Sequence, residues 1–442
     1  MSTASVTSDR PLNRRDAKTL LLSALGGALE FYDFVIFVYF AAVIGQLFFP
    51  PGQADWLKQL QSFGIFAAGY LARPLGGIVM AHFGDLMGRK RMFTLSVFMM
   101  AVPTFAIGLL PTYSAVGALA PVLLLILRVM QGAAIGGEIP GAWVFVAEHV
   151  PPRRVGLAVG SLTSGLTLGI LLGSLIATGF NSWFGKEAIA DYAWRLPFLI
   201  GGVFGLIAVV LRRWLEETPI FEAMRREKRL AQGLPLSTVL RGHGRAVVVA
   251  MLVTWLLTAA IVVVILMTPT LLQSQYHLGA GEVLVANCVA SFCLSIGCVL
   301  AGLAVDAFGV GPVLGLGSIL LAGSTFLLFS VAASAPEWLV PAYGAAGLFV
   351  GTVGAVPSVL VRCFPPAIRF SGISASYNIA YAIFGGLTPL MIQSAIGAGL
   401  SSAPALYVAL LCLLGIVLAV TGLHRIGGLD AAKPVAFGSA AD

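Results

Sequence analysis

The chain has 442 residues, of which 58% are hydrophobic and only 10% are charged, and its mean hydropathy is +0.95. These values exclude a soluble globular domain, because such domains carry about 25% charged residues. The 52 glycines suit helices that pack closely in lipid, where small residues let two backbones approach. The net charge of +7 could indicate nucleic acid, but the positions of the basic residues decide its meaning.

A helix needs about 20 apolar residues to span a bilayer. The chain contains twelve such runs, at residues 19–46, 60–83, 92–111, 118–147, 157–180, 196–214, 246–272, 282–304, 312–333, 338–361, 371–396 and 402–424. We therefore expect an all-α integral membrane protein with two six-helix bundles, at 19–214 and 246–424. An N-terminal segment (1–18), a linker (215–245) and a tail (425–442), all cytoplasmic, complete this division.

The orientation follows from the basic residues, because an even number of spans places both termini on one side. Nearly all loop lysines and arginines, Arg212 and Arg213 among them, fall on that side, and only Lys58, Lys186 and Arg195 fall on the other. Cytoplasmic loops are enriched in basic residues, so the pattern predicts cytoplasmic termini and needs no nucleic-acid partner. The first 17 residues lack the features of a cleaved signal peptide, which predicts that the first helix stays as an anchor.

The first predicted helix carries two acids, Glu30 and Asp33, about halfway through the span. They are three residues apart and share a helix face, where two bare carboxylates would repel each other. One of them should hold a proton, which makes both candidates for proton coupling. The alternative is a buried acid that pairs with an arginine for structure alone. Tyr32 could line a cavity or belong to the aromatic belt at the membrane interface.

The second predicted helix carries Arg73 at a similar depth. A charged side chain in hydrocarbon is costly and is by default a sign of function. Because the planar guanidinium suits a carboxylate, Arg73 could pair with the acids of the first helix or bind an anionic substrate. Tyr70, one turn earlier, faces the same way.

A charged turn follows the second helix, with the sequence Gly84-Asp85-Leu86-Met87-Gly88-Arg89-Lys90-Arg91. Its glycines allow a tight reversal, Asp85 can cap the start of the next helix, and Arg89 can reach an acid elsewhere. Glu148, just before the Pro-Pro-Arg-Arg run at 151–154, supplies an acid near this turn. The alternative is a solvated basic loop.

The fourth predicted helix holds Arg128, Gln131 and Glu138 within one quadrant of a helical wheel, with glycines between them. We expect a polar stripe that serves substrate and proton. Glu138 has a plainer alternative, which is to satisfy backbone groups freed by Pro140.

Two further stretches need only structural roles. Gly165, Gly169 and Gly173 of the fifth predicted helix form a ladder that indicates a packing seam. The polar linker at 215–245 is explained by a solvated amphipathic segment between the halves.

The second half repeats the plan of the first. The motif Gly302-x-x-x-Asp306-x-x-Gly309 mirrors the charged turn, although without its basic residues. Two matching halves indicate parallel repeats with the substrate between them near the midplane. The second half offers neutral polar groups, Tyr377, Asn378 and Tyr381 among them. We therefore expect proton chemistry in the first half, and hydrogen bonds and shape from the second.

Nothing in the sequence indicates metal or catalytic chemistry. The cysteines at 288, 293 and 298 are five residues apart on one helix and point in different directions, which favours packing over a metal site. No His-Glu-x-x-His, Ser-His-Asp or paired-cysteine pattern indicates an enzyme. We expect no metal and no cofactor.

The Gly-Asp-x-x-Gly-Arg-Lys turn at 84–90 and the Arg-x-x-Gln-Gly motif at 128–132 resemble those of the major facilitator superfamily. More narrowly, the chain resembles the metabolite:proton symporters, whose members carry citrate, 2-oxoglutarate, shikimate, proline or betaine. The motifs that carry this narrower resemblance are Leu29-Glu30-Phe31-Tyr32-Asp33-Phe34, Arg73-Pro74-Leu75-Gly76-Gly77, Gly136-Gly137-Glu138, Arg369-Phe370-Ser371-Gly372, Tyr377-Asn378 and Gly385-Gly386-Leu387-Thr388-Pro389.

The resemblance implies roles for particular residues. A gate that closes the cytoplasmic side would consist of Asp85, Gly88, Arg89, Glu148 and Arg154. Proton coupling would fall to Glu30, Asp33 and Glu138. Substrate binding would fall to Arg73, Arg128, Tyr32, Tyr70, Gln131, Tyr377, Asn378 and Tyr381.

The chain departs from the family pattern at Ala81, Arg362 and Ala367. The last two agree with the missing basic residues after Asp306. We therefore expect that the second copy of the gate has been lost as a unit.

These observations predict a symporter of the bacterial inner membrane that brings a small organic anion into the cell with protons, by alternating access. The proton gradient would supply the energy, the partners would be substrate, protons and membrane lipid, and the protein would act as a monomer. One alternative is uptake of a zwitterion of the proline or betaine type, since acids lie near the arginines. Another is proton antiport that exports an organic acid or a drug. A sensor is disfavoured, because the linker and tail leave no room for a signalling domain.

Overall fold

The computed structural model describes residues 12–215, 217–226 and 235–421, and this part of the chain contains helices and turns but no strand. The first half comprises α1 Arg14–Tyr39, α2 Ala41–Phe48, α3 Asp55–Met87, α4 Arg89–Leu109, α5 Tyr113–Val116, α6 Leu119–His149, η1 Pro152–Arg154, α7 Val155–Trp183, α8 Lys186–Ala188, η2 Ile189–Ala193 and α9 Arg195–Arg213. Two short helices of the linker follow, α10 Pro219–Arg226 and α11 Pro235–Gly242.

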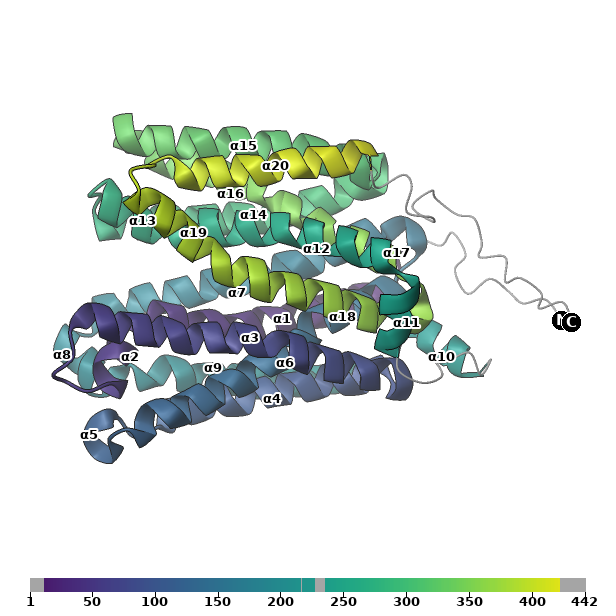
Figure 1. The fold of residues 1–442 in the computed structure, drawn as a ribbon. Coiled ribbons are helices and arrows are strands. Elements are labelled where there is room, and N and C mark those ends of the chain that lie inside the picture. Colours follow the sequence, from purple (N-terminus) through teal and green to yellow (C-terminus); the bar gives the residue numbers. More distant parts are fainter. Residues whose placement is uncertain (1–11, 216, 227–234, 422–442) are drawn as a thin grey trace, which may run out of the picture.

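The second half contains fewer straight helices than the first. Its elements are α12 Gly244–Ala259, η3 Ala260–Met267, α13 Thr268–Gln275, α14 Ala280–Phe308, α15 Val310–Ser334, η4 Pro336–Trp338, α16 Leu339–Val350, η5 Gly351–Ala355, α17 Val356–Cys363, η6 Pro366–Ile368, α18 Arg369–Ala380, η7 Tyr381–Gly385, α19 Gly386–Gly397 and α20 Ala403–Thr421. The two halves lie side by side as bundles of nearly parallel rods, the first below and the second above in Figure 1.

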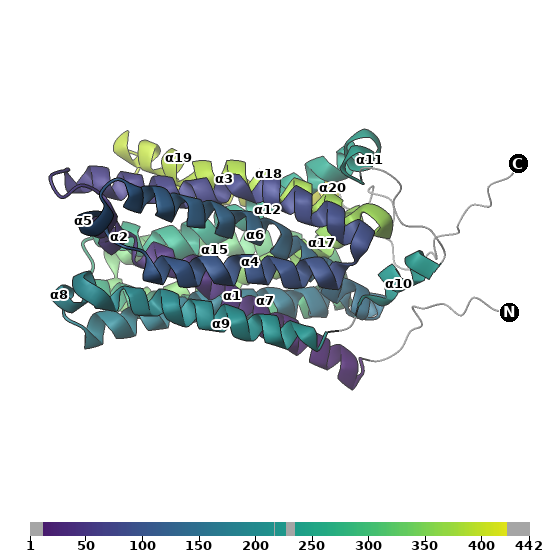
Figure 2. The ribbon, with the colours of Figure 1, turned by 90° about the horizontal axis from the view of Figure 1, so that it is seen from below.

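The halves meet along two lines of helix contact. On one line α7 packs against α14, and on the other α3 and α6 pack against α18. α3 and α18 also lie next to each other in both views (Figures 1 and 2). Residues that face these lines are the ones that can respond when one half moves relative to the other.

The expectation of a helical membrane protein is confirmed. Eleven described helical stretches are long and apolar enough to cross a membrane. The remaining expected span is α3, whose 33 residues run alongside the others but do not belong to those eleven, so the count of twelve stays a prediction. The start of α1 and the end of α20 lie at the same end of the bundle, together with α10 and α11 (Figures 1 and 2). That this end faces the cytoplasm also stays a prediction.

Glycines let α3 and α6 approach until their backbones touch. A Cβ atom at Gly76 would overlap the backbone of Ala133, and one at Gly136 would overlap the carbonyl oxygen of Arg73. This seam fixes Arg73 relative to the glycine-rich stretch of α6, because neither helix can turn about its axis without a clash.

The ladder on α7 forms a second seam, as its spacing predicts. Gly165 lies against Ala24 of α1, and Gly169 lies against Ala28 and Phe31 of the same helix. The pair therefore packs as one unit within the first half.

The linker is more than a solvated segment, which corrects the expectation from its polarity. Phe221 of α10 is only 2% exposed, and Val239 of α11 is also buried. α11 packs on α18 and on α3. The helices of the linker thus cover part of the end of the bundle where the charged turn lies (Figure 2).

The seam between α3 and α6 predicts opposite effects for two glycine substitutions. Gly136→Ala places a Cβ atom 2.8 Å from the amide nitrogen of Gly77, and such overpacking costs about 1–3 kcal/mol. We expect this variant to melt several degrees lower in detergent. Gly323→Ala on α15 is the matched control, because no atom lies within 4 Å of its new Cβ. Equal melting temperatures for the two variants would contradict the seam.

Candidate functional site

Arg73 lies in a cluster of aromatic rings between the two halves. Its guanidinium carbon is 4.2 Å from the ring centre of Tyr381 and 5.5 Å from those of Tyr70 and Tyr377. Tyr70 stacks on Tyr381 with ring centres 5.7 Å apart, and Trp143 meets the ring of Tyr377 edge-on at 5.0 Å. α3 supplies Arg73 and Tyr70, whereas α18 and η7 supply the other two tyrosines. The cluster therefore contains residues of both halves.

The hydrogen bonds of Arg73 point to the second half as well. Its Nε donates to Oδ1 of Asn378 at 3.4 Å, and the amide of Asn378 donates to the Gly136 carbonyl oxygen at 2.6 Å. No ion pair joins Arg73 to an acidic side chain in the part of the chain that the structure describes. Of the two fates open to Arg73, pairing with Asp33 is not the one observed. The side chain of Glu30 lies outside the described residues.

Asp33 is fully buried within the first half. Its carboxylate lies beside Thr104 of α4 and against Gly201 of α9, and neither oxygen has a hydrogen-bond partner that meets ordinary geometry among the described residues. Tyr32, predicted to bind substrate, instead packs inside the same half and donates its hydroxyl hydrogen to the Pro197 carbonyl oxygen at 2.9 Å.

A line of polar side chains leads from Asp33 towards the middle of α6. Thr104 accepts a hydrogen bond from Nε2 of Gln131 at 2.6 Å, and Oε1 of Gln131 accepts one from Arg128 at 2.7 Å. The guanidinium of Arg128 also lies over the ring of Phe37, 4.2 Å from its centre. The structure thus brings Asp33, Arg128 and Gln131 into one network, linked by Thr104, which the sequence analysis did not single out.

Glu138 forms a buried ion pair with a residue that the sequence analysis placed in a cytoplasmic loop. Nη2 of Arg212 donates to Oε1 of Glu138 at 2.6 Å, and the same guanidinium lies 3.4 Å from the ring centre of Phe93. Both charged side chains are almost fully buried. The count of basic residues by side of the membrane was wrong for Arg212, because an arginine at a helix end can turn inward when an acid lies one helix away.

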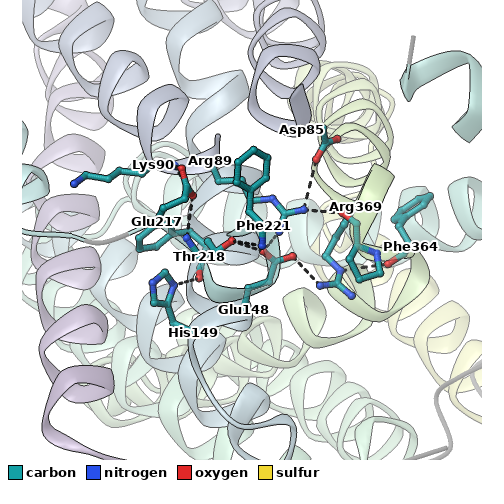
Figure 3. A network of polar contacts seen from close by, with 12 residues as sticks. Asp85, Arg89, Lys90, Glu148, His149, Glu217, Thr218, Phe221, Phe364 and Arg369 are labelled. Carbon is teal, nitrogen blue, oxygen red and sulfur yellow. Dashed lines mark hydrogen bonds and ion pairs between the residues drawn. The ribbon is translucent and has the colours of Figure 1, made fainter. Parts of the chain in front are cut away.

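A second polar network lies at the end of the bundle that carries α10 and α11 (Figure 3). Glu148 is its centre: one oxygen pairs with Arg89 and accepts from Thr218 at 3.0 Å, and the other accepts from Arg369 at 2.9 Å. Arg89 also donates to the Pro366 carbonyl oxygen at 2.7 Å. The network therefore joins α4 and α6 of the first half to η6 and α18 of the second.

Asp85 caps a helix of the opposite half. Its Oδ2 accepts from the amide and from the hydroxyl of Ser371, both at 2.9 Å, in the first turn of α18. We expected it to cap the following helix, α4. Instead, Glu217 of the linker accepts from the Lys90 amide there, at 3.2 Å. The reason is geometric, because Gly88 at φ +120° reverses the chain and leaves Asp85 on the side of α18.

The second copy of the gate is only partly lost, which corrects another expectation. Asp306 accepts from the amides of Gly156 and Leu157, at 2.7 and 2.9 Å, in the first turn of α7. The two turns are thus related: each half places an aspartate on a helix N-terminus of the other half. What the second copy lacks is the arginine and glutamate ion pair. Arg154, predicted for the gate, is exposed, and Arg369 is the second cation on Glu148.

Several of these partners carry a signal in the sequence that could have been used. Arg369 and Ser371 stand in the Arg-Phe-Ser-Gly motif, at the position in the second half that matches Arg153 in the first. Glu217 and Thr218 had no such signal, because a polar linker has the same composition whether it is solvated or packed.

The paired bundles, the buried polar groups between them and the contacts that close one end define a secondary transporter. Three comparisons agree with this class. A family model described as Major Facilitator Superfamily matches residues 23–303. A putative proline/betaine transporter of Staphylococcus aureus is 33% identical over 420 residues, which cover 93% of this chain and 89% of the relative. An ectoine/proline transporter of Corynebacterium glutamicum is 32% identical and is covered to 80%, with 87% of this chain.

A solved structure of similar fold is the proton:xylose symporter XylE bound to 6-bromo-6-deoxy-D-glucose, with a TM-score of 0.77 at 17% identity, covering 93% of this chain and 96% of that one. The chain belongs to the major facilitator superfamily, in its metabolite:proton symporter branch. It is a multi-pass transporter of the bacterial inner membrane and not an enzyme.

Glu148 predicts how the closed end opens. Losing one partner of a buried ion pair costs about 3–5 kcal/mol, so Glu148→Gln should weaken the contacts of Arg89 and Arg369 and favour the open state. The measurement is maleimide labelling of Ser374→Cys, a buried position against the Gly136 carbonyl oxygen, with the native cysteines replaced. We expect labelling from that end to become several-fold faster.

The control is Glu222→Gln, which breaks an exposed pair with Arg226 and should leave the labelling rate unchanged. An unchanged rate in Glu148→Gln would mean that this network does not hold the end closed.

Proposed function

We propose that this transporter carries small zwitterions of the proline and betaine type into the cell together with protons. The observation that carries the proposal is the cluster of Arg73 with three tyrosine rings at the junction of the halves. A carboxylate suits the guanidinium fork, and a cationic group suits aromatic faces. One cluster therefore offers complementary chemistry for both ends of a zwitterion.

The relatives support the same substrate class. They are named for proline, betaine and ectoine, which favours the zwitterion over the organic anion that the sequence alone suggested first. The binding groups agree, since a di- or tricarboxylate would leave the aromatic faces without a cation.

Asp33 is the group that we propose to carry the proton. An ionised carboxylate with no hydrogen bond and no neighbouring cation costs several kcal/mol inside the bilayer, and a proton removes that cost. Gln131 and Thr104 connect it to Arg128. Movement of Arg128 towards Asp33 would replace the proton by an ion pair, which is a route for its release.

The contacts at the closed end supply the moving part. Both aspartate caps, Asp85 on α18 and Asp306 on α7, join the halves through hydrogen bonds. Such polar contacts can break and re-form as the halves rock, whereas the glycine seams keep each half rigid. Substrate and proton together would lower the cost of that movement by neutralising buried charge.

Uptake into proteoliposomes tests the substrate class. With an acidic outside, we expect labelled betaine or proline to accumulate, and we expect an uncoupler to abolish the accumulation. Citrate, 2-oxoglutarate and shikimate are the comparison substrates. Accumulation of these carboxylates alone would overturn the proposal, and loss of preloaded solute under the same gradient would indicate export.

Asp33→Asn predicts that coupling is lost while binding is kept. The amide has the shape of the protonated acid but cannot release a proton, so gradient-driven accumulation should fall to the level of empty liposomes. Exchange of labelled for unlabelled substrate should continue, because it needs no net proton movement.

Asp191→Asn is the control for this variant, since Asp191 is exposed at the far end of the bundle. Full accumulation by Asp33→Asn would remove Asp33 from the coupling mechanism.

A further inference from the structure

We infer that Tyr70, Tyr377 and Tyr381 form the subsite for the cationic group of the substrate, and that the guanidinium of Arg73 occupies this subsite when no substrate is bound. This inference rests on the proposed function, because it assumes a zwitterionic substrate. It adds where the cation binds and what holds its place in the empty transporter.

The surroundings of Arg73 are those of a ligand cation more than those of a structural arginine. A buried arginine of a membrane protein is normally paired with an acid or with backbone carbonyl groups. Here its described contacts are ring faces and one long hydrogen bond of 3.4 Å to Asn378. Its Nη2 atom is buried and has no hydrogen-bond partner among the described residues. Glu138 and Arg212 show the contrast, since they form a close ion pair of 2.6 Å.

The rings are arranged for a compact cation. Tyr70 and Tyr381 are nearly parallel, with an interplanar angle of 7°, and Tyr377 is tilted by 51° to Tyr381. Aromatic cages of this kind recognise quaternary ammonium groups through the negative faces of the rings. The same faces attract a guanidinium, so Arg73 and a substrate cation compete for one place.

Exchange of the two cations explains how binding can be sensed by both halves. When a substrate ammonium group takes the ring faces, the guanidinium of Arg73 leaves them, and its fork becomes available for the carboxylate of the same substrate. The amide of Asn378 lies beside that position and donates its hydrogens to the Gly136 carbonyl oxygen. Substrate thus replaces contacts between the halves by contacts to itself.

The backbone at Tyr381 can accommodate such an exchange. Tyr381 is the first residue of η7, a π-helical turn that runs to Gly385, and π-helical turns occur often at functional sites. No atom would lie within 4 Å of a Cβ at the next residue, Gly386. The ring of Tyr381 therefore sits on a helix segment with room on one side.

The chemistry defines the substrates. A cation with attached methyl groups or a small ring fills the space between the tyrosines, and a carboxylate one or two atoms away reaches the Arg73 fork. Betaine and proline meet both conditions. A simple carboxylate meets one of them and should bind weakly.

Arg73→Gln tests the competition, because its two effects have opposite signs. Removal of the internal cation should tighten binding of tetramethylammonium about tenfold, whereas betaine should bind about tenfold or more weakly because its carboxylate loses its partner. Binding is measured by calorimetry on the full chain in detergent. The fluorescence of Trp143, whose ring meets Tyr377, is a second readout and should disappear in Trp143→Phe.

Tyrosine variants test the rings. Tyr381→Leu should weaken betaine binding about tenfold, Tyr381→Phe should keep it, and Tyr276→Leu is the control because Tyr276 packs on Phe329 away from the site. If Arg73→Gln does not fold, Arg73→Lys provides the comparison, since the lysine ammonium lacks the planar fork. We expect weaker betaine binding there and tetramethylammonium binding at least equal to wild type.

The outcomes separate this inference from the proposed function. If wild-type protein accumulates betaine or proline, but tetramethylammonium neither binds nor competes and Tyr381→Leu binds betaine normally, the tyrosines only hold Arg73 and the inference is wrong. If tetramethylammonium binds less tightly to Arg73→Gln than to wild type, the competition is likewise wrong. If wild-type protein accumulates only carboxylates, the proposed function itself fails.

Discussion

The cost of placing charge in hydrocarbon controls the arrangement of this transporter more than any other constraint. A charged side chain at the centre of a bilayer costs at least about 2.5–3.5 kcal/mol, and the described buried charges are accommodated in different ways. Glu138 and Arg212 form an ion pair, Arg73 lies among aromatic rings, and Asp33 has no hydrogen-bond partner of ordinary geometry. The pair is a stable arrangement, whereas the other two depend on a group that can leave, which is a substrate for the rings and a proton for the acid.

Rigid and reversible contacts are separated in space. Within the first half, α3 meets α6 and α1 meets α7 along glycine seams that leave no room for a side chain. Across the halves at the closed end, aspartates cap helices and Glu148 binds two arginines. A packed seam cannot slide without clashes, but a hydrogen-bonded cap can be exchanged for water at modest net cost. This separation is what movement of two rigid bundles requires.

The linker adds to the closed end. Glu217 and Thr218 bind the start of α4 and the central acid of the ion-pair network, and Phe221 is buried beside them. The connection between the halves therefore contacts the same charged groups that open and close, so linker and gate cannot move independently.

The sequence by itself determined the class of the molecule. Apolar runs, the excess of basic residues on one side and the repeated turn motifs predict a two-bundle membrane transporter, because helix formation in lipid depends on local composition. It also singled out Arg73, Arg128, Asp33, Glu138 and Glu148, because ionisable residues inside apolar runs are conspicuous.

Only the tertiary structure decided the partners of these residues. Arg73 faces tyrosines of the other half, more than 300 residues away along the chain, and not the acid of the first helix. Arg212 turns inward to Glu138, Asp85 reaches α18, and Arg369 takes the place expected for Arg154. Pairings of this kind depend on the rotation of each helix about its axis and on the contact between halves. Neither is encoded in local periodicity, since the same pattern is compatible with several neighbours.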